Sequence, residues 1–452
     1  MNLEKFFTAK NIAIIGVSQN PNKVGHVIFR NFIDGGFLGK LFVVNPTVDS
    51  ILNHVSYKSI LDIKEKIDLA IIAIPAEGVL NALEECGKNG IKQVIIITSG
   101  FSEIGNNELE DKLKKILKRY GILCIGPNCL GIFDSSSRID SLFLPRYRLK
   151  RPREGHLGFI SQSGAVGSTI LDLATSEGYG CSKFISYGNA TNVDESDLIE
   201  FLGNDRNTKV ICVYIEGVKN GKKFMKICSE VSKKKPIVIV KGGKSEEGNK
   251  ATLSHTGSLA GNALVYSAAF KQSGVIEVDN LENLFDVART LEKCIKPKGD
   301  RVQIITNGGG YGIMATDAVI QNCLRMAQLE KKTADSLKKV LPKNATTGNP
   351  IDLVGDADTS RYKKAIDCCL NDKSSDILLV IALYQVPLLT TDVIDVITEA
   401  NDLKKKPILV VSVGGEFTEV LKKSLEENNV PCFNFPHNAV NAIRALVDYQ
   451  RD

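Results

Sequence analysis

The sequence predicts an α/β protein built from open, mostly parallel β-sheets. Short apolar runs alternate with segments of helical periodicity along almost all 452 residues, a spacing that is typical of βαβ units. In three places an apolar strand leads directly into a loop of glycine and small polar residues and then into a helix, at residues 11–25, 157–167 and 302–312. A chain of this length exceeds one ordinary domain, so we expect two to four.

Composition and charge narrow the class of protein. Apolar residues make up 43% and charged residues 24%, as in an ordinary globular protein. The net charge is only +5, an excess that says little about nucleic acid, and we expect no nucleic-acid partner. The 11 cysteines include no CxxC pair and the five histidines show no ligand spacing, which favours buried reduced thiols, a cytoplasmic location and no metal. Residues 1–10 lack the apolar core of a signal peptide, and no apolar run approaches the roughly 18 residues of a membrane span.

The first domain is expected over residues 1–134. Its strands are predicted at residues 11–17, 41–45, 69–74, 94–98 and 122–125, with helices between most of them, which gives a Rossmann-like open sheet. Residues 135–154 then form a basic, proline-punctuated linker that contains PRYR and KRPR. Two interpretations stay open for it: a solvated connector, or a surface that contacts a partner subunit or a phosphate group.

The remaining chain predicts two copies of one flavodoxin-like unit, at residues 155–296 and 299–452. The first copy begins with GFISQSGAVG at residues 158–167 and the second with QIITNGGGYG at residues 303–312. Further strands are expected at residues 183–185, 210–215, 237–241, 377–383, 408–413 and 432–435. An amphipathic helix closes each copy, at residues 281–291 and 439–447.

The first strand-to-helix turn, GVSQNPNKVG at residues 16–25, indicates a phosphate-bearing ligand. Small residues there let a phosphate approach the N–H groups of the following helix, and Ser18 and Lys23 could add a hydroxyl and an ammonium. The turn is not GxGxxG, and the second strand ends in Asn45 and Pro46, where an NAD site would place an acidic residue. Both facts argue against an NAD-linked oxidoreductase. The alternative is a tight turn without a ligand.

Other loops are expected at the same sheet edge, because ligands bind at the carboxyl ends of strands in open α/β sheets. Pro75, the TSGF loop at residues 98–101 and the GPNCLG loop at residues 126–131 could together form a long cleft. Two further loops each begin a helix and could bind an anion through its positive N-terminus; either could also be a simple chain reversal. Their residues are Ser161, Gln162, Ser163, Gly164, Asn307, Gly308, Gly309 and Gly310.

His255 is the strongest candidate for a catalytic residue. It lies in KATLSHTGSLAG at residues 250–261, a stretch of small residues that leaves an imidazole accessible. An imidazole is mostly neutral near pH 7 and can act as a nucleophile. Glu216 follows the strand at residues 210–215 and could accept the Nδ1–H of His255, which would fix its tautomer. A salt bridge from Glu216 to a lysine is the alternative.

These motifs, in this order, resemble the ADP-forming acyl-CoA synthetases, the branch that includes ADP-forming acetate–CoA ligase and is related to succinyl-CoA synthetase. The resemblance rests on the loops quoted above together with IEG at residues 215–217, and it covers nearly the whole chain. It implies an N-terminal CoA-binding domain followed by two succinyl-CoA synthetase-like ligase domains. The residues that it implies for CoA are Gly16, Ser18, Lys23, Asn45, Pro75, Ser99, Phe101 and Asn128, the last two near the thioester.

The resemblance also implies the chemistry. Phosphate, held by the two anion loops, attacks an acyl-CoA thioester; His255, supported by Glu216, takes the phosphoryl group and passes it to ADP. One departure concerns Thr47, because many relatives have a lysine after the Asn-Pro pair. A second is that we find no ATP-grasp region, which would need roughly 200 further residues.

We therefore expect Mg²⁺ and ADP or ATP on an ATP-grasp β subunit, in an α2β2 assembly. Acetate is the substrate that the resemblance favours. Two alternatives stay open: the same chemistry on succinate or on a branched or aryl acid, and a non-catalytic CoA-binding regulator.

Overall fold

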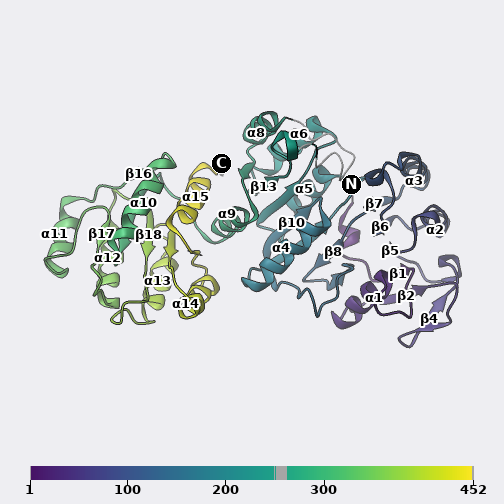
Figure 1. Cartoon of the computed structure of the whole chain (residues 1–452), viewed down its shortest axis with the longest axis horizontal. Helices are drawn as coiled ribbons and strands as arrows, with labels where there is room; N and C mark the ends of the chain where they lie inside the picture. Colours follow the sequence, from purple (N-terminus) through teal and green to yellow (C-terminus); the bar gives the residue numbers. More distant parts are fainter. Residues whose placement is uncertain (1, 249, 251–261, 450–452) are drawn as a thin grey trace. The chain divides into compact units, whose positions relative to one another are not determined.

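The computed structural model describes residues 2–248, 250 and 262–449 (Figure 1). The chain divides into two compact units, Met1–Asp279 and Asn280–Asp452, and each is described by itself. The predicted α/β class is confirmed, since helices alternate with strands of mostly parallel sheets in both units. None of the helices in the described part of the chain is long and apolar enough to cross a membrane.

The first sheet of the N-terminal unit has the order β3-β4-β2-β1-β5-β6-β7. Its parallel strands are β1 (Asn11–Ile15), β2 (Lys40–Val44), β4 (His54–Tyr57), β5 (Leu69–Ile72), β6 (Gln93–Ile96) and β7 (Leu123–Ile125), and β3 (Ser50–Ile51) is antiparallel to β4. The connecting helices are α1 (Val24–Asp34), α2 (Ala76–Lys88) and α3 (Asn107–Tyr120), with short 3-10 turns η1 (Glu4–Phe6), η2 (Ile60–Asp62) and η3 (Ser102–Ile104). The strand order reverses at β1, and such a switch point is where open sheets bind ligands.

The second sheet of this unit has the order β14-β13-β12-β10-β11-β8-β9. Five strands are parallel: β10 (Glu154–Ser161), β11 (Cys181–Ser186), β12 (Val210–Ile215), β13 (Ile237–Lys241) and β14 (Ile276–Val278). The described helices around it are α4 (Gly164–Ser176), α5 (Glu195–Asn204), α6 (Gly221–Val231) and α8 (Ala263–Gln272).

The antiparallel edge of this sheet differs from the expectation. β8 (Gly131–Asp134) pairs with β11, and β9 (Ile139–Asp140) pairs with β8, although residues 131–134 were expected in the first domain and residues 135–154 in a linker. The following basic segment is solvated only in part, because Arg148, Lys150 and Arg153 are exposed while Leu149 and Pro152 are buried. Arg151 is buried beside Asp140, and Asn31 of α1 donates hydrogen bonds to the carbonyl oxygens of Leu142 and Leu144 at 2.6 and 3.0 Å.

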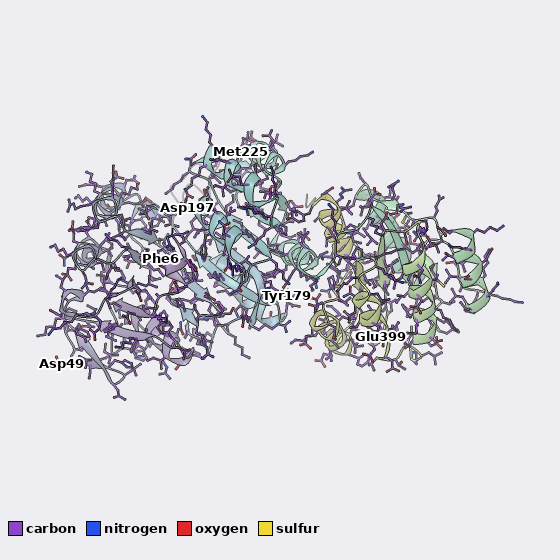
Figure 2. The ribbon with its side chains drawn as sticks, turned by 180° about the vertical axis from the view of Figure 1, so that it is seen from behind. Phe6, Asp49, Tyr179, Asp197, Met225 and Glu399 are labelled. Atoms are coloured by element: carbon purple, nitrogen blue, oxygen red, sulfur yellow. The ribbon has the colours of Figure 1, made fainter. Side chains whose placement is uncertain are left out.

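One hydrophobic cluster joins the two sheets of the N-terminal unit. It contains Ile14 of β1 and Ile160 of β10, together with Phe6 and Phe7 from the start of the chain. Phe6 is fully buried (Figure 2), and the ring of Phe7 stacks on that of Phe201 in α5 with 5.1 Å between centroids. Burial of several aromatic rings stabilises such a junction by roughly 2 kcal/mol each.

The C-terminal unit is built on a parallel sheet of order β16-β15-β18-β19-β20, with β17 also paired to β15. Its strands are β15 (Arg301–Thr306), β16 (Arg325–Met326), β17 (Ile351–Asp352), β18 (Ile377–Ile381), β19 (Ile408–Val411) and β20 (Cys432–Phe433). Its helices are α9 (Leu281–Lys293), α10 (Gly309–Gln321), α11 (Lys331–Val340), α12 (Thr359–Asn371), α13 (Val393–Asp402), α14 (Glu416–Glu427) and α15 (Pro436–Asp448).

Helix α9 packs within this C-terminal unit, although the sequence assigned it to the middle domain. Arg289 of α9 lies 4.3 Å from the centroid of the Phe433 ring and donates a 2.7 Å hydrogen bond to the carbonyl oxygen of Cys432. The carboxylate of Glu426 in α14 accepts hydrogen bonds from both Arg289 and Lys293. The helix predicted at residues 281–291 is present, and Leu284–Leu291 are all buried, but periodicity alone does not tell which sheet a helix packs against.

Candidate functional site

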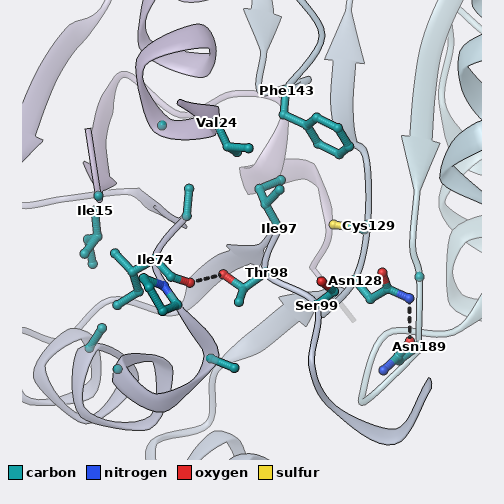
Figure 3. Close-up of a pocket in the computed structure, with 18 of the residues that line it drawn as sticks. Ile15, Val24, Ile74, Ile97, Thr98, Ser99, Asn128, Cys129, Phe143 and Asn189 are labelled. Carbon is teal, nitrogen blue, oxygen red and sulfur yellow. Dashed lines mark hydrogen bonds between the residues drawn. The ribbon is translucent and has the colours of Figure 1, made fainter. Parts of the chain in front are cut away.

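A cavity of about 1420 Å³ opens at the carboxyl ends of the first sheet and extends to the N-terminus of α4 (Figure 3). Both sheets of the N-terminal unit contribute to it. Of the residues predicted for a ligand site, those that line it are Gly16, Ser18, Lys23, Asn45, Pro75, Ser99, Asn128, Gln162, Ser163, Gly164 and Glu216. The structure therefore brings together loops that lie up to 200 residues apart in the sequence.

The first strand-to-helix turn is held close to its neighbours by two glycines. Gly16 has φ +101°, and a Cβ there would lie 2.4 Å from the carbonyl oxygen of Ala73. A Cβ on Gly25 would lie 2.2 Å from the carbonyl oxygen of Gly16. Lys23, the N-cap of α1, makes no side-chain capping hydrogen bond. The first N–H groups of α1 therefore face the cavity without a side-chain acceptor, an arrangement that suits an anion.

Asn45 connects this turn to the next one. Its Nδ2 donates to the carbonyl oxygen of Val17 at 2.6 Å, and its Oδ1 accepts hydrogen bonds from the N–H and the hydroxyl of Thr47, both at 2.8 Å. Asn45 thus fixes the geometry of two loops with both ends of its amide. Thr47 lines the cavity, and so does Lys58.

Lys58 is a site residue that sequence reasoning missed. It directly follows β4, whose four residues alternate too weakly to be recognised as a strand. Lys58 adds a positive charge to the residues that line the cavity, as Lys23 does. The one signal available was its position between the short strand β4 and the capping residue Ser59.

The loops after β5 and β6 form the middle of the cavity. Thr98 donates a 2.7 Å hydrogen bond to the carbonyl oxygen of Ile74 (Figure 3). Phe101 does not line the cavity; its side chain is fully buried in the core of the first sheet. Its backbone N–H instead donates to the carboxylate of Glu103 at 3.2 Å. An aromatic residue in a glycine-containing loop can point either way, and the sequence does not determine which.

The first anion loop lies at the far end of the cavity. Ser163 caps α4 by accepting a 3.4 Å hydrogen bond from the N–H of Val166. Ser161 is fully buried and does not line the cavity; its hydroxyl donates to the carbonyl oxygen of Ser163 at 2.7 Å. Gln162 accepts hydrogen bonds from the N–H groups of Glu216 and Gly217 at 2.7 and 3.2 Å. Gln162 therefore holds the loop after β12 beside the N-terminus of α4.

Glu216 lines this end of the cavity and is 6% exposed. The hydroxyl of Tyr214 donates to its Oε1 at 3.4 Å. Lys241, at the end of the neighbouring strand β13, lies with its ammonium 4.8 Å from the centroid of the Tyr266 ring. Burial lowers the pKa of Lys241, and the charge of Glu216 opposes that shift. The charges of Glu216 and Lys241 therefore attract each other at this end of the cavity.

The second anion loop belongs to the C-terminal unit. Asn307 is buried, and its amide both donates to and accepts from the backbone of Leu383 at 3.1 and 3.0 Å. Gly308 is the N-cap of α10 and offers no side chain, while Gly309 and Gly310 are exposed. The backbone at the start of α10 is therefore exposed at Gly309 and Gly310, whereas the side-chain amide of Asn307 is hydrogen-bonded to the backbone of Leu383. His255 lies outside the described residues.

The same domains occur in known proteins. Residues 10–134 match the family described as CoA binding domain, residues 154–291 the succinyl-CoA ligase like flavodoxin domain, and residues 302–449 the ligase-CoA domain. The alpha subunit of Acetate--CoA ligase [ADP-forming] I of Pyrococcus furiosus is 39% identical over 465 residues, which cover 100% of this chain and 98% of that one.

Two further relatives extend the comparison. The Acetate--CoA ligase [ADP-forming] of Methanocaldococcus jannaschii is 42% identical over 97% of this chain, but the chain spans only 62% of that relative. The structure of the Ca. Korarchaeum cryptofilum dinucleotide forming acetyl-coenzyme A synthetase 1 in complex with phosphate and ADP superposes with a TM-score of 0.93 at 35% identity, covering 99% of this chain and 97% of that one. This chain therefore belongs to the family of alpha subunits of the ADP-forming acetate–CoA ligases.

Proposed function

We propose that this chain is the CoA-binding and phosphoryl-carrying subunit of an enzyme that reversibly converts acetyl-CoA, ADP and phosphate to acetate, ATP and CoA. One observation carries the proposal: a single cavity joins the glycine-rich turn before α1 to the anion loop before α4 and to Glu216. An elongated thioester with phosphates at one end and its reactive carbon at the other fits a cavity with cationic and anion-binding sites at both ends.

The residues present suit CoA at the first end. Lys23 and Lys58 supply two ammonium groups, and the uncapped N-terminus of α1 supplies backbone N–H donors and about half a positive charge. Ser18 adds a hydroxyl to the same wall. The phosphates of CoA would be bound here, which leaves the thiol end to reach the loop at Asn128.

Inorganic phosphate would then bind beside the N-terminus of α4, at Ser163 and Gly164. A phosphate oxygen forms a bond to the acyl carbon and the carbon–sulfur bond breaks, which releases CoA and leaves acyl phosphate. His255 attacks the phosphorus of acyl phosphate through a ring nitrogen, and the carboxylate leaves as acetate. Glu216 would hold the other ring nitrogen and stabilise the cationic ring. The phosphoryl group finally passes from His255 to ADP.

We assign ADP or ATP and Mg²⁺ to an ATP-grasp β subunit in an α2β2 complex. The name of the Pyrococcus furiosus relative, subunit alpha, supports a partner chain, and the Methanocaldococcus jannaschii relative is longer than this chain. We place the enzyme in the cytoplasm, because all eleven cysteines are free, as is usual for a reducing compartment.

Acetate is proposed on the names of several relatives, but other acids stay possible within the same chemistry. The 4-hydroxybutyrate--CoA ligase [ADP-forming] of Nitrosopumilus maritimus is 35% identical over 97% of this chain. The test is to mix the purified chain with its ATP-grasp partner and to measure ATP formed from ADP, phosphate and a panel of acyl-CoA thioesters. ATP formation that depends on both chains supports the proposal; a complex that binds CoA yet forms no ATP from any thioester contradicts it.

A further inference from the structure

The side-chain amide of Asn189 lies at the wall of the cavity, in the loop that follows β11. Its Nδ2 faces three oxygens of the loop after β6 and of α3: Glu103 Oε2 at 2.6 Å, Glu110 Oε2 at 3.1 Å and Ser102 Oγ at 3.3 Å. Two of these acceptors are carboxylates. Asn189 carries no signal in the sequence, since one asparagine after a strand is ordinary.

The two carboxylates determine which way the Asn189 amide faces. An ionised carboxylate only accepts hydrogen bonds, so the NH₂ group must point toward Glu103 and Glu110 and the carbonyl oxygen must point away. Glu110 is 1% exposed. Its burial opposes ionisation, but hydrogen bonds from Ser102 and Asn189 and the charge of Lys219 outweigh the burial, and the pKa of the carboxyl lies below its ordinary value.

The carbonyl oxygen of Asn189 in turn faces Asn128. The Nδ2 of Asn128 donates to it at 3.3 Å, as Figure 3 shows. The nitrogen of the Asn128 amide therefore points toward Asn189 and its oxygen points away from Asn189. Since Asn128 lines the cavity, that oxygen is available to accept a hydrogen bond from a ligand.

The backbone of the Asn189 loop is held independently of this side chain. The N–H of Asn189 donates to the carbonyl oxygen of Pro127 at 3.0 Å. Gly188 has φ +55°, and a Cβ there would lie 2.2 Å from that same oxygen, so the two loops touch through backbone alone. Removal of the Asn189 side chain should therefore release the Asn128 amide without separating the loops.

We infer that Asn189 is a positioning residue, fixed by Glu103 and Glu110, that orients the carbonyl oxygen of Asn128 to accept a hydrogen bond from the thiol end of CoA. The inference rests on the proposed function, because it takes CoA to be the ligand of the cavity. Without Asn189 the Asn128 amide can rotate, and either its nitrogen or its oxygen can face the sulfur. Such a loss of orientation should slow the reaction of the thiol and leave the binding of the rest of CoA unchanged.

A double-mutant cycle tests this relay. Thioester formation from acetyl phosphate and CoA is measured without nucleotide for the full-length chain as wild type, Asn128→Ala, Asn189→Ala and the double variant, and CoA affinity is measured by calorimetry. Asn192→Ala is the matched control. Asn192 lies in the same loop and binds the backbone of Cys124 and Ile122 at 2.9 and 2.8 Å, but does not line the cavity.

We expect Asn189→Ala to lower turnover about tenfold with CoA affinity within about threefold of wild type, and Asn192→Ala to change turnover less than about twofold. The double variant should turn over within about twofold of Asn128→Ala, because both substitutions remove one interaction. The inference would be overturned if the losses of turnover in the two single variants added up in the double variant. It would also be overturned if Asn189→Ala turned over as fast as wild type, or if Asn192→Ala lost as much turnover as Asn189→Ala. A wild-type chain that binds no CoA would instead overturn the proposed function on which it rests.

Discussion

The guanidinium of Arg151 forms a two-point ion pair with the carboxylate of Asp140. Nε lies 2.9 Å from Oδ2 and Nη2 lies 3.1 Å from Oδ1, and the two side chains are 2% and 1% exposed. Nη2 of Arg151 also donates to the carbonyl oxygen of Leu144 at 2.9 Å. This pair fixes the segment between β9 and β10 against the second sheet, and so holds the wall that carries Phe143 beside the cavity.

We predict that Arg151→Met destabilises the N-terminal unit by about 3 kcal/mol, because it leaves Asp140 buried with only Arg146 as a partner. Urea unfolding followed by circular dichroism measures the change. Arg148→Met is the control, since Arg148 lies in the same segment and is exposed, and it should alter stability by less than about 0.5 kcal/mol. Equal effects of the two substitutions would contradict a buried ion pair.

This segment also shows where sequence reasoning reached its limit. The strands of the parallel sheets were predictable because each is a continuous apolar run buried on both faces, as in β12 and β13. β8 and β9 are short, and β9 consists of two residues, so no periodicity marks them. The basic residues around Arg151 suggested solvent exposure, because the partner Asp140 can be recognised only once β9 is paired with β8.

Lys58 leads to a prediction about CoA. If Lys58 faces a phosphate, Lys58→Met should weaken CoA binding about two- to fivefold at low ionic strength, and the loss should shrink as salt screens the charge. Calorimetric titration of CoA at two salt concentrations measures this. Lys64→Met is the control, because Lys64 is exposed and does not line the cavity. A loss of affinity that is independent of salt, or shared by the control, would argue against a phosphate contact.

The candidate site was predictable in its loops but not in all of its side chains. Strand order in an open sheet places the loops after β1, β2, β5, β6 and β7 at one edge, so their glycines and polar residues could be gathered from sequence. Which side chain points into the cavity depends on packing. Phe101 and Ser161 are buried elsewhere, while Lys58 and Asn189 enter the cavity from a short strand and from a different sheet.

Glu195, the first residue of α5, should make stability depend on pH. It is 1% exposed, and its Oε1 has no hydrogen-bond partner among the described residues. Burial raises the pKa of its carboxyl from 4.5 to about 7, and the nearby charge of Asp194 adds to that shift. Below about pH 4.5 the carboxyl is protonated in both the folded and the unfolded chain, so its burial as a charge does not lower the free energy of unfolding. As pH rises toward 7 the unfolded chain loses its proton first, so stability falls by about 3 kcal/mol.

Glu195→Gln should remove this dependence. We expect the free energy of unfolding of the variant to exceed that of the wild type by more at pH 8 than at pH 5. Urea unfolding at both pH values measures this difference. Glu230→Gln is the control, since Glu230 is exposed in α6, and it should show the pH dependence of the wild type. If Glu195→Gln also loses as much stability as wild type between the two pH values, the buried carboxyl is not the cause.

The proposed function depends most on His255 as the phosphoryl carrier, and protein labelling tests that role directly. The chain and its ATP-grasp partner are incubated with ATP that carries a radioactive γ-phosphate, and the acid-labile label on this chain is counted. We expect label on the wild type and on His437→Ala, which changes an exposed histidine of α15, and none on His255→Ala. A His255→Ala chain that becomes labelled as strongly as the wild type would show that His255 is not the phosphoryl carrier.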